Sequence, residues 1–373
     1  MANEKALNGA VTPDWRGLKL WKHQADAVET CLSYLENHPD EVSGLVNHPT
    51  GSGKTGIMAV LSALQAVSGP VLIVCPSSAL VDQLIRELSS RFWQTIGAPD
   101  SWHPGRTERL YPSNLGAVLK LLNRGSQTPT VIVATVQALQ QIHKDPSYRD
   151  LVGKFSVVIF DEGHREPAPS WAAAVRELRA PTLLFSATPY RNDYKLFHVS
   201  LEHIHFLSFQ RAASEGIIRP VQILESDLSN NVSRFAAQII DKRDEMIARG
   251  LIDKGDKVII RAHTEQNVQD LFDAFCAQLS TRPEKVLAIH ENFYLREERG
   301  NTLARDVPPN IRSRSERFLI HQFKLTEGID DPACRVLALY DRYTTERQFI
   351  QQVGRLTRHP GQAGTVAPPA FVL

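Results

Sequence analysis

Short, continuous apolar runs recur along the chain and are separated by segments with helical spacing. Such runs are typical of strands buried on both faces, as in a parallel sheet flanked by helices. Between them, apolar residues recur three or four positions apart, as Ile57, Val60, Leu61 and Leu64 do. The pattern therefore predicts an α/β fold with mainly parallel sheets. The expected strands are residues 44–46, 71–75, 131–135, 157–160, 182–185, 257–261, 286–289, 317–320 and 334–339.

The pattern changes near residues 206–220, where a short helix over 210–215 and a connector over 216–220 precede a second α/β series. A chain of 373 residues is also long enough for two cores. We therefore expect a flexible N-terminus (1–14), a first domain (15–208), a linker (209–220) and a second domain (221–373). Residues 91–130 contain tryptophans, arginines, prolines and glycines. This composition favours an elaborated, solvated connection over a nucleic-acid contact.

Composition narrows the class of protein. Hydrophobic residues make up 42% and charged residues 22%, as in an ordinary globular protein. The net charge of +1 means that any surface for nucleic acid has to be local. The four cysteines are widely spaced and form no CxxC pair, which favours reduced thiols. No secretory signal or membrane-length apolar run is evident, so we expect a soluble, cytoplasmic protein without membrane contact.

The most informative stretch is His48-Pro49-Thr50-Gly51-Ser52-Gly53-Lys54-Thr55, which lies between an expected strand and an expected helix. A strand that turns through glycines into a helix N-terminus directs backbone N–H groups at a polyphosphate, and the helix dipole adds positive potential. Lys54 can reach the β- and γ-phosphates, and the Thr55 hydroxyl can ligate Mg²⁺. The strict pattern has glycine first, where this chain has His48. The stretch predicts an ATP-binding loop.

Two carboxylates, Asp161 and Glu162, follow the expected strand over 157–160. The carboxyl end of a parallel strand is where α/β proteins bind ligands. Asp161 can hold the Mg²⁺ that Thr55 also ligates, directly or through water. Glu162 can orient and deprotonate the attacking water. Together with the phosphate loop, the pair predicts hydrolysis of a nucleotide.

Three further groups accompany the loop and the carboxylates. Upstream, Trp21 and Gln24 could form an adenine pocket by stacking and amide pairing. Ser186 and Thr188 end another expected strand and could relay the state of the nucleotide. In the second domain, which has no phosphate loop of its own, Arg355 and Arg358 lie three apart on an expected helix. We expect them to complete the ATP site from across a cleft, as an arginine finger does.

With these motifs in this order, the chain resembles a superfamily 2 helicase core. The similarity extends from Gln24 to Arg358 and favours the DEAH-like branch that contains restriction-enzyme motor subunits, including type III restriction enzymes, and repair helicases. The resemblance implies two tandem RecA-like domains, with ATP in the cleft between them and nucleic acid crossing both. Gly163 stands where alanine or cysteine is commoner, which fits the restriction-type relatives.

The resemblance also assigns roles to matching positions. The catalytic residues are Lys54, Asp161, Glu162, Arg355 and Arg358, with Thr55 and Asp161 on the metal. Contacts to ATP are assigned to Trp21, Gln24, Pro49, Thr50, Gly51, Ser52, Gly53, Lys54, Thr55, Gly328, Asp330 and Gln351. Coupling between domains is assigned to His164, Ser186 and Thr188. Contacts to the nucleic-acid backbone are assigned to Pro76, Ser77, Thr135, His263 and Thr326, and such contacts carry no sequence information.

These assignments predict an ATP- and Mg²⁺-dependent helicase or translocase that moves on or unwinds DNA, in restriction, phage defence or repair. An RNA helicase is an alternative, because phosphate contacts do not separate DNA from RNA. A nucleic-acid-gated ATPase that clamps without unwinding is another. The sequence ends soon after Arg358, in what resembles the beginning of a further strand. We therefore expect either a longer natural protein or a minimal motor that serves further domains or subunits.

Overall fold

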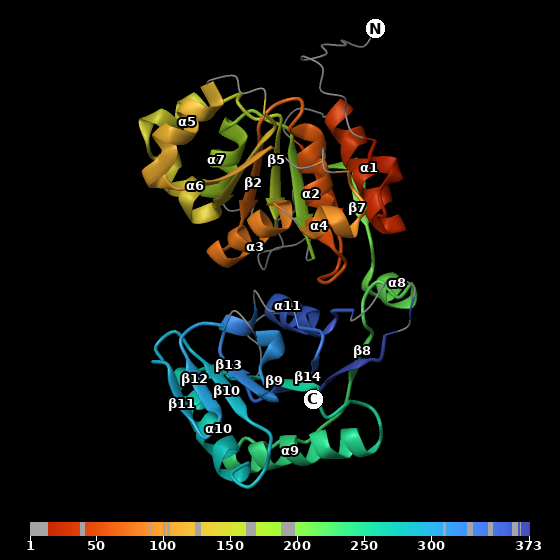
Figure 1. Cartoon of the computed structure of the whole chain (residues 1–373), viewed down its shortest axis with the longest axis vertical. Coiled ribbons are helices and arrows are strands. Elements are labelled where there is room, and N and C mark those ends of the chain that lie inside the picture. The colour runs from red at the N-terminus through yellow and green to blue at the C-terminus, as the bar shows by residue number, and fades with distance from the viewer. Residues whose placement is uncertain are drawn as a thin grey trace. The chain divides into compact units, whose positions relative to one another are not determined.

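The computed structural model describes residues 14–37, 42–89, 91–99, 102, 105–123, 128–161, 169–187, 198–308, 311–326, 331–341, 346–359, 365 and 367–373. The chain divides into two compact units. The first comprises residues up to Pro49 together with Gly53–Ser208, and the second comprises Thr50–Ser52 together with Phe209–Leu373. Each unit contains one sheet with helices on both faces (Figure 1). The domain boundaries expected from the sequence stay a prediction.

The first unit is built on a sheet of seven strands within the described residues, in the order β3-β4-β2-β5-β6-β1-β7, with every pair parallel. Its strands are β1 (Ser43–Asn47), β2 (Val71–Cys75), β3 (Arg106–Leu110), β4 (Thr130–Thr135), β5 (Val157–Asp161), β6 (Thr182–Ser186) and β7 (Val199–Phe206). Its helices are α1 (Lys22–Asn37), α2 (Lys54–Gln65), α3 (Ser78–Ser89), α4 (Arg91–Thr95), α5 (Leu115–Asn123), α6 (Val136–His143) and α7 (Pro169–Glu177).

Successive side chains along a strand of this sheet point to opposite faces, and both faces are covered by helices. In β2, Val71, Ile73 and Cys75 pack in one cluster with α1–α4, whereas Leu72 and Val74 pack in another with α5–α7. All five residues are buried. A strand with two buried faces must be apolar at every position. The continuous apolar runs in the sequence are therefore the direct cause of this layered fold.

The second unit has a sheet with the strand order β11-β12-β10-β13-β9-β14-β15-β8, parallel except for the β11–β12 pair. Helices α9 and α10 cover one face of this sheet and α11 covers the other (Figure 1). Its strands are β8 (Val221–Ile223), β9 (Lys257–Arg261), β10 (Val286–Ile289), β11 (Arg296–Glu298), β12 (Asn301–Ala304), β13 (Phe318–His321), β14 (Cys334–Leu339) and β15 (Ala370–Val372). Its helices are α8 (Phe209–Ser214), α9 (Val232–Ala248), α10 (Glu265–Gln278) and α11 (Glu346–Leu356).

The segment over residues 91–130 differs from the expected solvated connection. It contributes β3, which forms one edge of the first sheet by pairing with β4. Trp93 and Trp102 are buried in the core, and the Trp93 indole N–H donates to the Leu88 carbonyl (2.8 Å). Arg106 and Arg109 are paired with acidic side chains. The strand was missed because four of its five residues are polar, as an edge strand permits.

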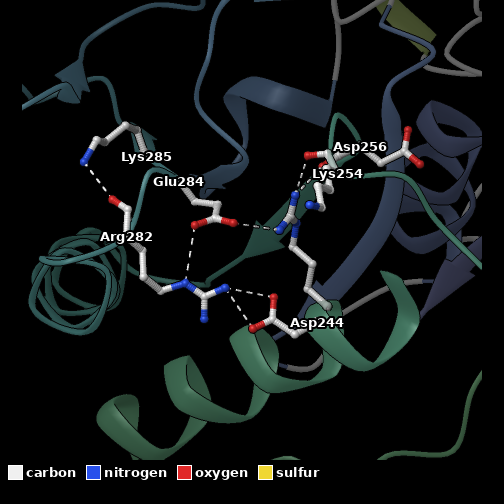
Figure 2. Close-up of polar contacts among 7 residues, drawn as sticks. Asp244, Lys254, Asp256, Arg282, Glu284 and Lys285 are labelled. Carbon is white, nitrogen blue, oxygen red and sulfur yellow. Dashed lines mark hydrogen bonds and ion pairs between the residues drawn. The ribbon is translucent and has the colours of Figure 1, made fainter. Parts of the chain in front are cut away.

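An ion-pair network fixes α9 to the turns around it in the second unit (Figure 2). Arg282 binds both carboxylate oxygens of Asp244, at 2.9 and 2.8 Å, and its Nε donates to Glu284 at 3.3 Å. Arg243 has only 2% of its side chain exposed and donates to Glu284 (3.4 Å) and to the Lys254 carbonyl (2.7 Å). Burial lowers the pKa of Arg243, and the nearby Glu284 and Asp244 oppose that shift.

We predict that Arg243→Ala destabilises the second unit. The substitution removes a buried cation that joins two chain segments, and breaking a buried pair of this kind costs about 3 kcal/mol. Urea unfolding measures the loss. Arg234→Ala is the matched control, because Arg234 is an exposed arginine on the same helix. Equal losses for the two variants would contradict the assignment.

A second prediction concerns pH. His321 is fully buried, and burial followed by the charge of Arg261 lowers its pKa to about 3. Between about pH 3 and its usual value near 6.5, the unfolded state binds the proton and the folded state does not. Stability therefore falls as pH drops below about 6.5, by up to about 1.4 kcal/mol per pH unit for this histidine.

Urea unfolding at pH 7.5, 6.5 and 5.5 tests this prediction. The comparison is with His321→Asn, whose side-chain oxygen can still accept from the Leu325 N–H, as His321 Nδ1 does at 3.3 Å. The variant should show a shallower loss of stability toward pH 5.5 than the natural chain. Identical pH dependence would rule out a role for His321.

Candidate functional site

The site residues expected in the first unit gather at one edge of its sheet. Because all the strand pairs in this sheet are parallel, their carboxyl ends lie at the same edge. Asp161 ends β5, Ser186 ends β6, and the phosphate loop leaves β1. Strand β6 lies between β5 and β1, with Ser186 opposite Asn47. This edge is where α/β folds bind ligands.

The phosphate loop has the backbone shape that an anion requires. Gly51 and Gly53 have φ angles of 90° and 81°, in the left-handed region that favours glycine. Gly53 is the N-cap of α2 and offers no side-chain hydrogen bond to the helix. The first turn of α2 thus presents backbone donors and the positive end of the helix dipole. Thr55, the proposed metal ligand, lies in that first turn.

Gln24 lies directly against this loop. Its Nε2 donates to the Gly53 carbonyl (3.1 Å), and its Oε1 accepts from the backbone N–H of Trp21 (3.1 Å). A Cβ atom on Gly53 would lie 2.4 Å from Gln24 Nε2, so any other residue here would displace the Gln24 amide. The structure therefore brings Gln24 to the loop across 29 positions of sequence. Its reading of adenine, and the stacking of Trp21, stay predictions.

Lys54 is tied to the start of its own loop. Its ammonium donates to the carbonyls of His48 (3.0 Å) and Pro49 (3.3 Å). The cation is thereby held beside the glycine turn, where the charge of a phosphate would need to be balanced. The conformation of the glycines, the N-terminus of α2 and the lysine together fit a nucleoside triphosphate.

A metal site is supported less directly. Within the described part of the chain, no group of three or more His, Cys, Asp or Glu side chains could hold a metal ion. Mg²⁺ commonly takes one or two protein ligands and completes its shell with phosphates and water. The hydroxyl of Thr55 and the carboxylate of Asp161 have the right chemistry for that arrangement.

A histidine cluster underlies the phosphate loop. His48 is fully buried, and its Nε2 lies 2.6 Å from His205 Nδ1 on β7. The ring of His23 lies 5.6 Å from that of His48, and the ring of Trp21 lies 5.6 Å from that of His23. Burial, and then the charges of His205, Lys54 and His23, lower the pKa of His48 to about 2. His48 is therefore neutral at ordinary pH.

From the sequence, His48 was expected only as a departure from glycine, and His205 was given no role. The one available signal was the unusual histidine at the first loop position. Strand β7 itself was not expected, because polar residues interrupt its apolar ones and its residues are at most half-buried.

In the second unit, Gln351 and Arg355 lie on α11 and are half-buried. In the structure, this helix ends at Leu356. The expectation that Arg355 and Arg358 share a helical face is therefore wrong. Arg355 is in the last turn and Arg358 follows the helix. Their spacing therefore does not place their side chains by helical geometry alone.

Three of the five residues expected to contact nucleic acid make hydrogen bonds within their own units. Thr135 caps α6 by accepting from the Ala138 N–H (3.1 Å), and Ser77 accepts from the Leu80 N–H (3.4 Å). Pro76 is buried. His263 is exposed, and its backbone N–H donates to Asp341 (2.6 Å). Thr326 ends a short 3₁₀ helix, and its side chain lies outside the described structure.

Five predicted site residues lie outside the described residues. They are Glu162, His164, Thr188, Gly328 and Asp330. Their roles stay predictions from the sequence.

The chain is similar in sequence to known proteins. Residues 17–191 match the family described as type III restriction enzyme, res subunit. The chain is 21% identical over 387 aligned residues to the DNA 3'-5' translocase XPB2 of Sulfurisphaera tokodaii, covering 91% of this chain and 79% of that protein.

Solved structures show the same fold. The ATP-dependent type ISP restriction-modification enzyme LlaBIII, bound to DNA, matches 95% of this chain with a TM-score of 0.64 and 16% identity. A fragment described as an HsdR subunit of a type I restriction enzyme from Vibrio vulnificus matches 94% with a TM-score of 0.59 and 16% identity. The helicase Lhr of Mycobacterium smegmatis, bound to ssDNA and AMP-PNP, matches 94% with a TM-score of 0.57 and 18% identity.

This chain spans 27%, 63% and 45% of those three structures, respectively. The two sheets are thus those of tandem RecA-like domains. The resemblance to superfamily 2 helicase cores that the motifs predicted is confirmed: residues 17–191 are similar to the restriction-enzyme motor family, and most of the chain is similar in sequence to a DNA translocase.

Proposed function

We propose that this chain is the core of an ATP-dependent nucleic-acid motor, which hydrolyses ATP to move on or unwind DNA. The observation that carries the proposal is the phosphate loop, with its left-handed glycines and Lys54, at the same sheet edge as Asp161. The similarity to a DNA translocase over most of the chain supports the choice of DNA.

The chemistry follows from the residues of the first unit. The α2 N-terminus and Lys54 bind the phosphates, and Thr55 and Asp161 hold Mg²⁺. Mg²⁺ held there would neutralise charge on the phosphates, and Glu162 orients and deprotonates the attacking water. Pro49, Thr50, Gly51, Ser52 and Gly53 form the cradle. Gln24 and Trp21 orient the base.

The remaining groups come from both units. Arg355 and Arg358 stabilise the charge of the transition state, and arginine fingers of this kind raise turnover by about 10³–10⁵. Gly328, Asp330 and Gln351 sense the nucleotide, and His164, Ser186 and Thr188 couple its state to the nucleic acid. Closing on ATP and reopening after hydrolysis then changes the grip on the strand.

Pro76, Ser77, Thr135, His263 and Thr326 are proposed to contact the phosphates of the strand. Because the chain spans only part of LlaBIII, HsdR and Lhr, further domains or subunits of a defence or repair complex are proposed as partners. Within the described residues, no helix is long and apolar enough to cross a bilayer. The four cysteines are free, which supports a reducing, cytoplasmic location.

The proposal predicts ATP hydrolysis that rises when DNA is added. Phosphate release should be measured without nucleic acid and then with single-stranded DNA, duplex DNA and RNA, at low salt. The stimulation should weaken steeply as salt rises, because phosphate contacts dominate binding. Lys54→Ala should abolish hydrolysis. Lys120→Ala, a change at an exposed lysine on α5, is the matched control and should leave it intact.

The outcomes separate the alternatives. Stimulation by RNA alone would indicate an RNA helicase. DNA stimulation without displacement of a forked duplex, and without movement along it, would indicate a clamp. Hydrolysis that ignores every nucleic acid would refute the proposal.

A separate prediction concerns Glu162. Glu162→Gln removes the base but keeps the size and polarity of the side chain, so ATP should bind and hydrolysis should fall by about 10²–10⁴. Filter binding with labelled ATP and phosphate release measure the two effects. Normal turnover in a folded Glu162→Gln protein would exclude Glu162 as the base.

A further inference from the structure

The phosphate loop begins at a contact between two histidines. We propose that His205 is a positioning residue for this loop: through His48, its imidazole fixes the segment that receives the phosphates of ATP. The inference rests on the proposed ATP-dependent function and concerns how the site is preorganised. It gives a role to His205, which lies on β7 outside all the motifs named above.

His48 is held at three points. Its backbone N–H donates to the Ser186 carbonyl of β6 (3.1 Å), and its ring Nε2 pairs with His205 Nδ1 (2.6 Å). Its carbonyl accepts from the Lys54 ammonium (3.0 Å). Since the residue that orients Lys54 is the one that His205 holds, a shift of His48 would move an acceptor that fixes the catalytic lysine.

The register of the sheet brings His205 to this place. Strand β7 lies beside β1 at the edge of the first sheet, with Val46 opposite His205 and Asn47 opposite Phe206. The Leu207 N–H also donates to the Asn47 carbonyl (3.0 Å), which continues the pairing past the end of β7. His205 is therefore supported by regular strand pairing at the point where β1 becomes the loop.

The contact matters because His48 has few other options. Its ring is fully buried, and its Nδ1 has no hydrogen-bond partner within the described structure. The pair to His205 is the one side-chain hydrogen bond found for His48 among those residues. A neutral imidazole carries one donor and one acceptor, so one ring donates and the other accepts. Removing His205 would leave a buried polar ring unsatisfied, which is costly.

Another histidine on the same strand offers a matched control. His203 lies two residues before His205 and bonds Ser200 Oγ through Nδ1 (2.7 Å). Its ring packs edge-on against Tyr34, at 5.7 Å between centroids. His203 shares the strand and residue type of His205, and its described contacts are with Ser200 and Tyr34 rather than with the phosphate loop.

The first experiment measures binding of a fluorescent ATP analogue with Mg²⁺ and without nucleic acid. His205→Leu should weaken binding about 5- to 100-fold, as expected when a buried hydrogen bond is left unmade. His205→Asn, whose amide can take the place of Nδ1, should restore most of the affinity. His203→Leu should leave binding unchanged. Equal weakening in His205→Leu and His205→Asn, or none in a folded His205→Leu, would overturn the inference.

A double-substitution cycle tests whether the effect passes through His48. In a His48→Ala background, His205→Leu should add little further loss of binding. A full, additive loss would overturn the inference, because His205 would then act by another route. Hydrogen exchange of the loop amides without nucleotide gives a second readout. The exchange should quicken over residues 48–56 in His205→Leu and not in His203→Leu.

These results stay distinct from the proposed motor function. Analogue binding and loop exchange need neither DNA nor hydrolysis. If they depend on His205 while hydrolysis ignores every nucleic acid, the motor proposal fails and the positioning role stands. If DNA stimulates hydrolysis but His205→Leu binds the analogue normally, the reverse holds.

Discussion

Parallel pairing of strands that are buried on both faces is the constraint on which the rest of this structure depends. It requires a crossover connection, usually a helix, between parallel neighbours and brings their carboxyl ends to one edge. In the first unit, that edge collects the phosphate loop after β1, Asp161 after β5 and Ser186 after β6. Residues more than a hundred positions apart in sequence thus become neighbours through backbone pairing.

The sequence predicted best what both faces of a sheet demand. The apolar runs of β2, β4 and β10 are continuous because helices cover each side, and they were identified as strands. Strands β3, β7, β8 and β11 were missed because edge positions accept polar side chains, so Arg106–Leu110 and Arg296–Glu298 resemble loops. Strand β12 was missed because it is short and begins with the polar Asn301 and Thr302. Helix α11 was expected over Glu346–Leu356, as observed, but placing Arg358 on its face was wrong, because Arg358 follows the last helical turn.

The site could be predicted where a backbone shape requires one residue type. Gly51 and Gly53 adopt φ angles that favour glycine, and a side chain on Gly53 would also displace the Gln24 amide. These glycines can therefore be recognised in the sequence. The contact between His48 and His205 cannot be recognised there, because many residue pairs can meet between neighbouring strands. Only the register of β7 against β1 shows that these two rings touch.

The φ angles of the phosphate loop explain why its first position need not be glycine. The left-handed φ angles in the loop fall at Gly51 and Gly53, and His48 is absent from the described non-glycine residues with positive φ, which are Arg179 and Arg299. A side chain is therefore allowed at position 48. Its ring is buried and lies within hydrogen-bonding distance of His205 on β7, and a buried polar ring needs such a partner. Once that partner is His205, the side chain ties the start of the phosphate loop to the edge of the sheet. A glycine there would leave the loop without that tie, so the departure from the strict pattern replaces backbone freedom with a fixed anchor.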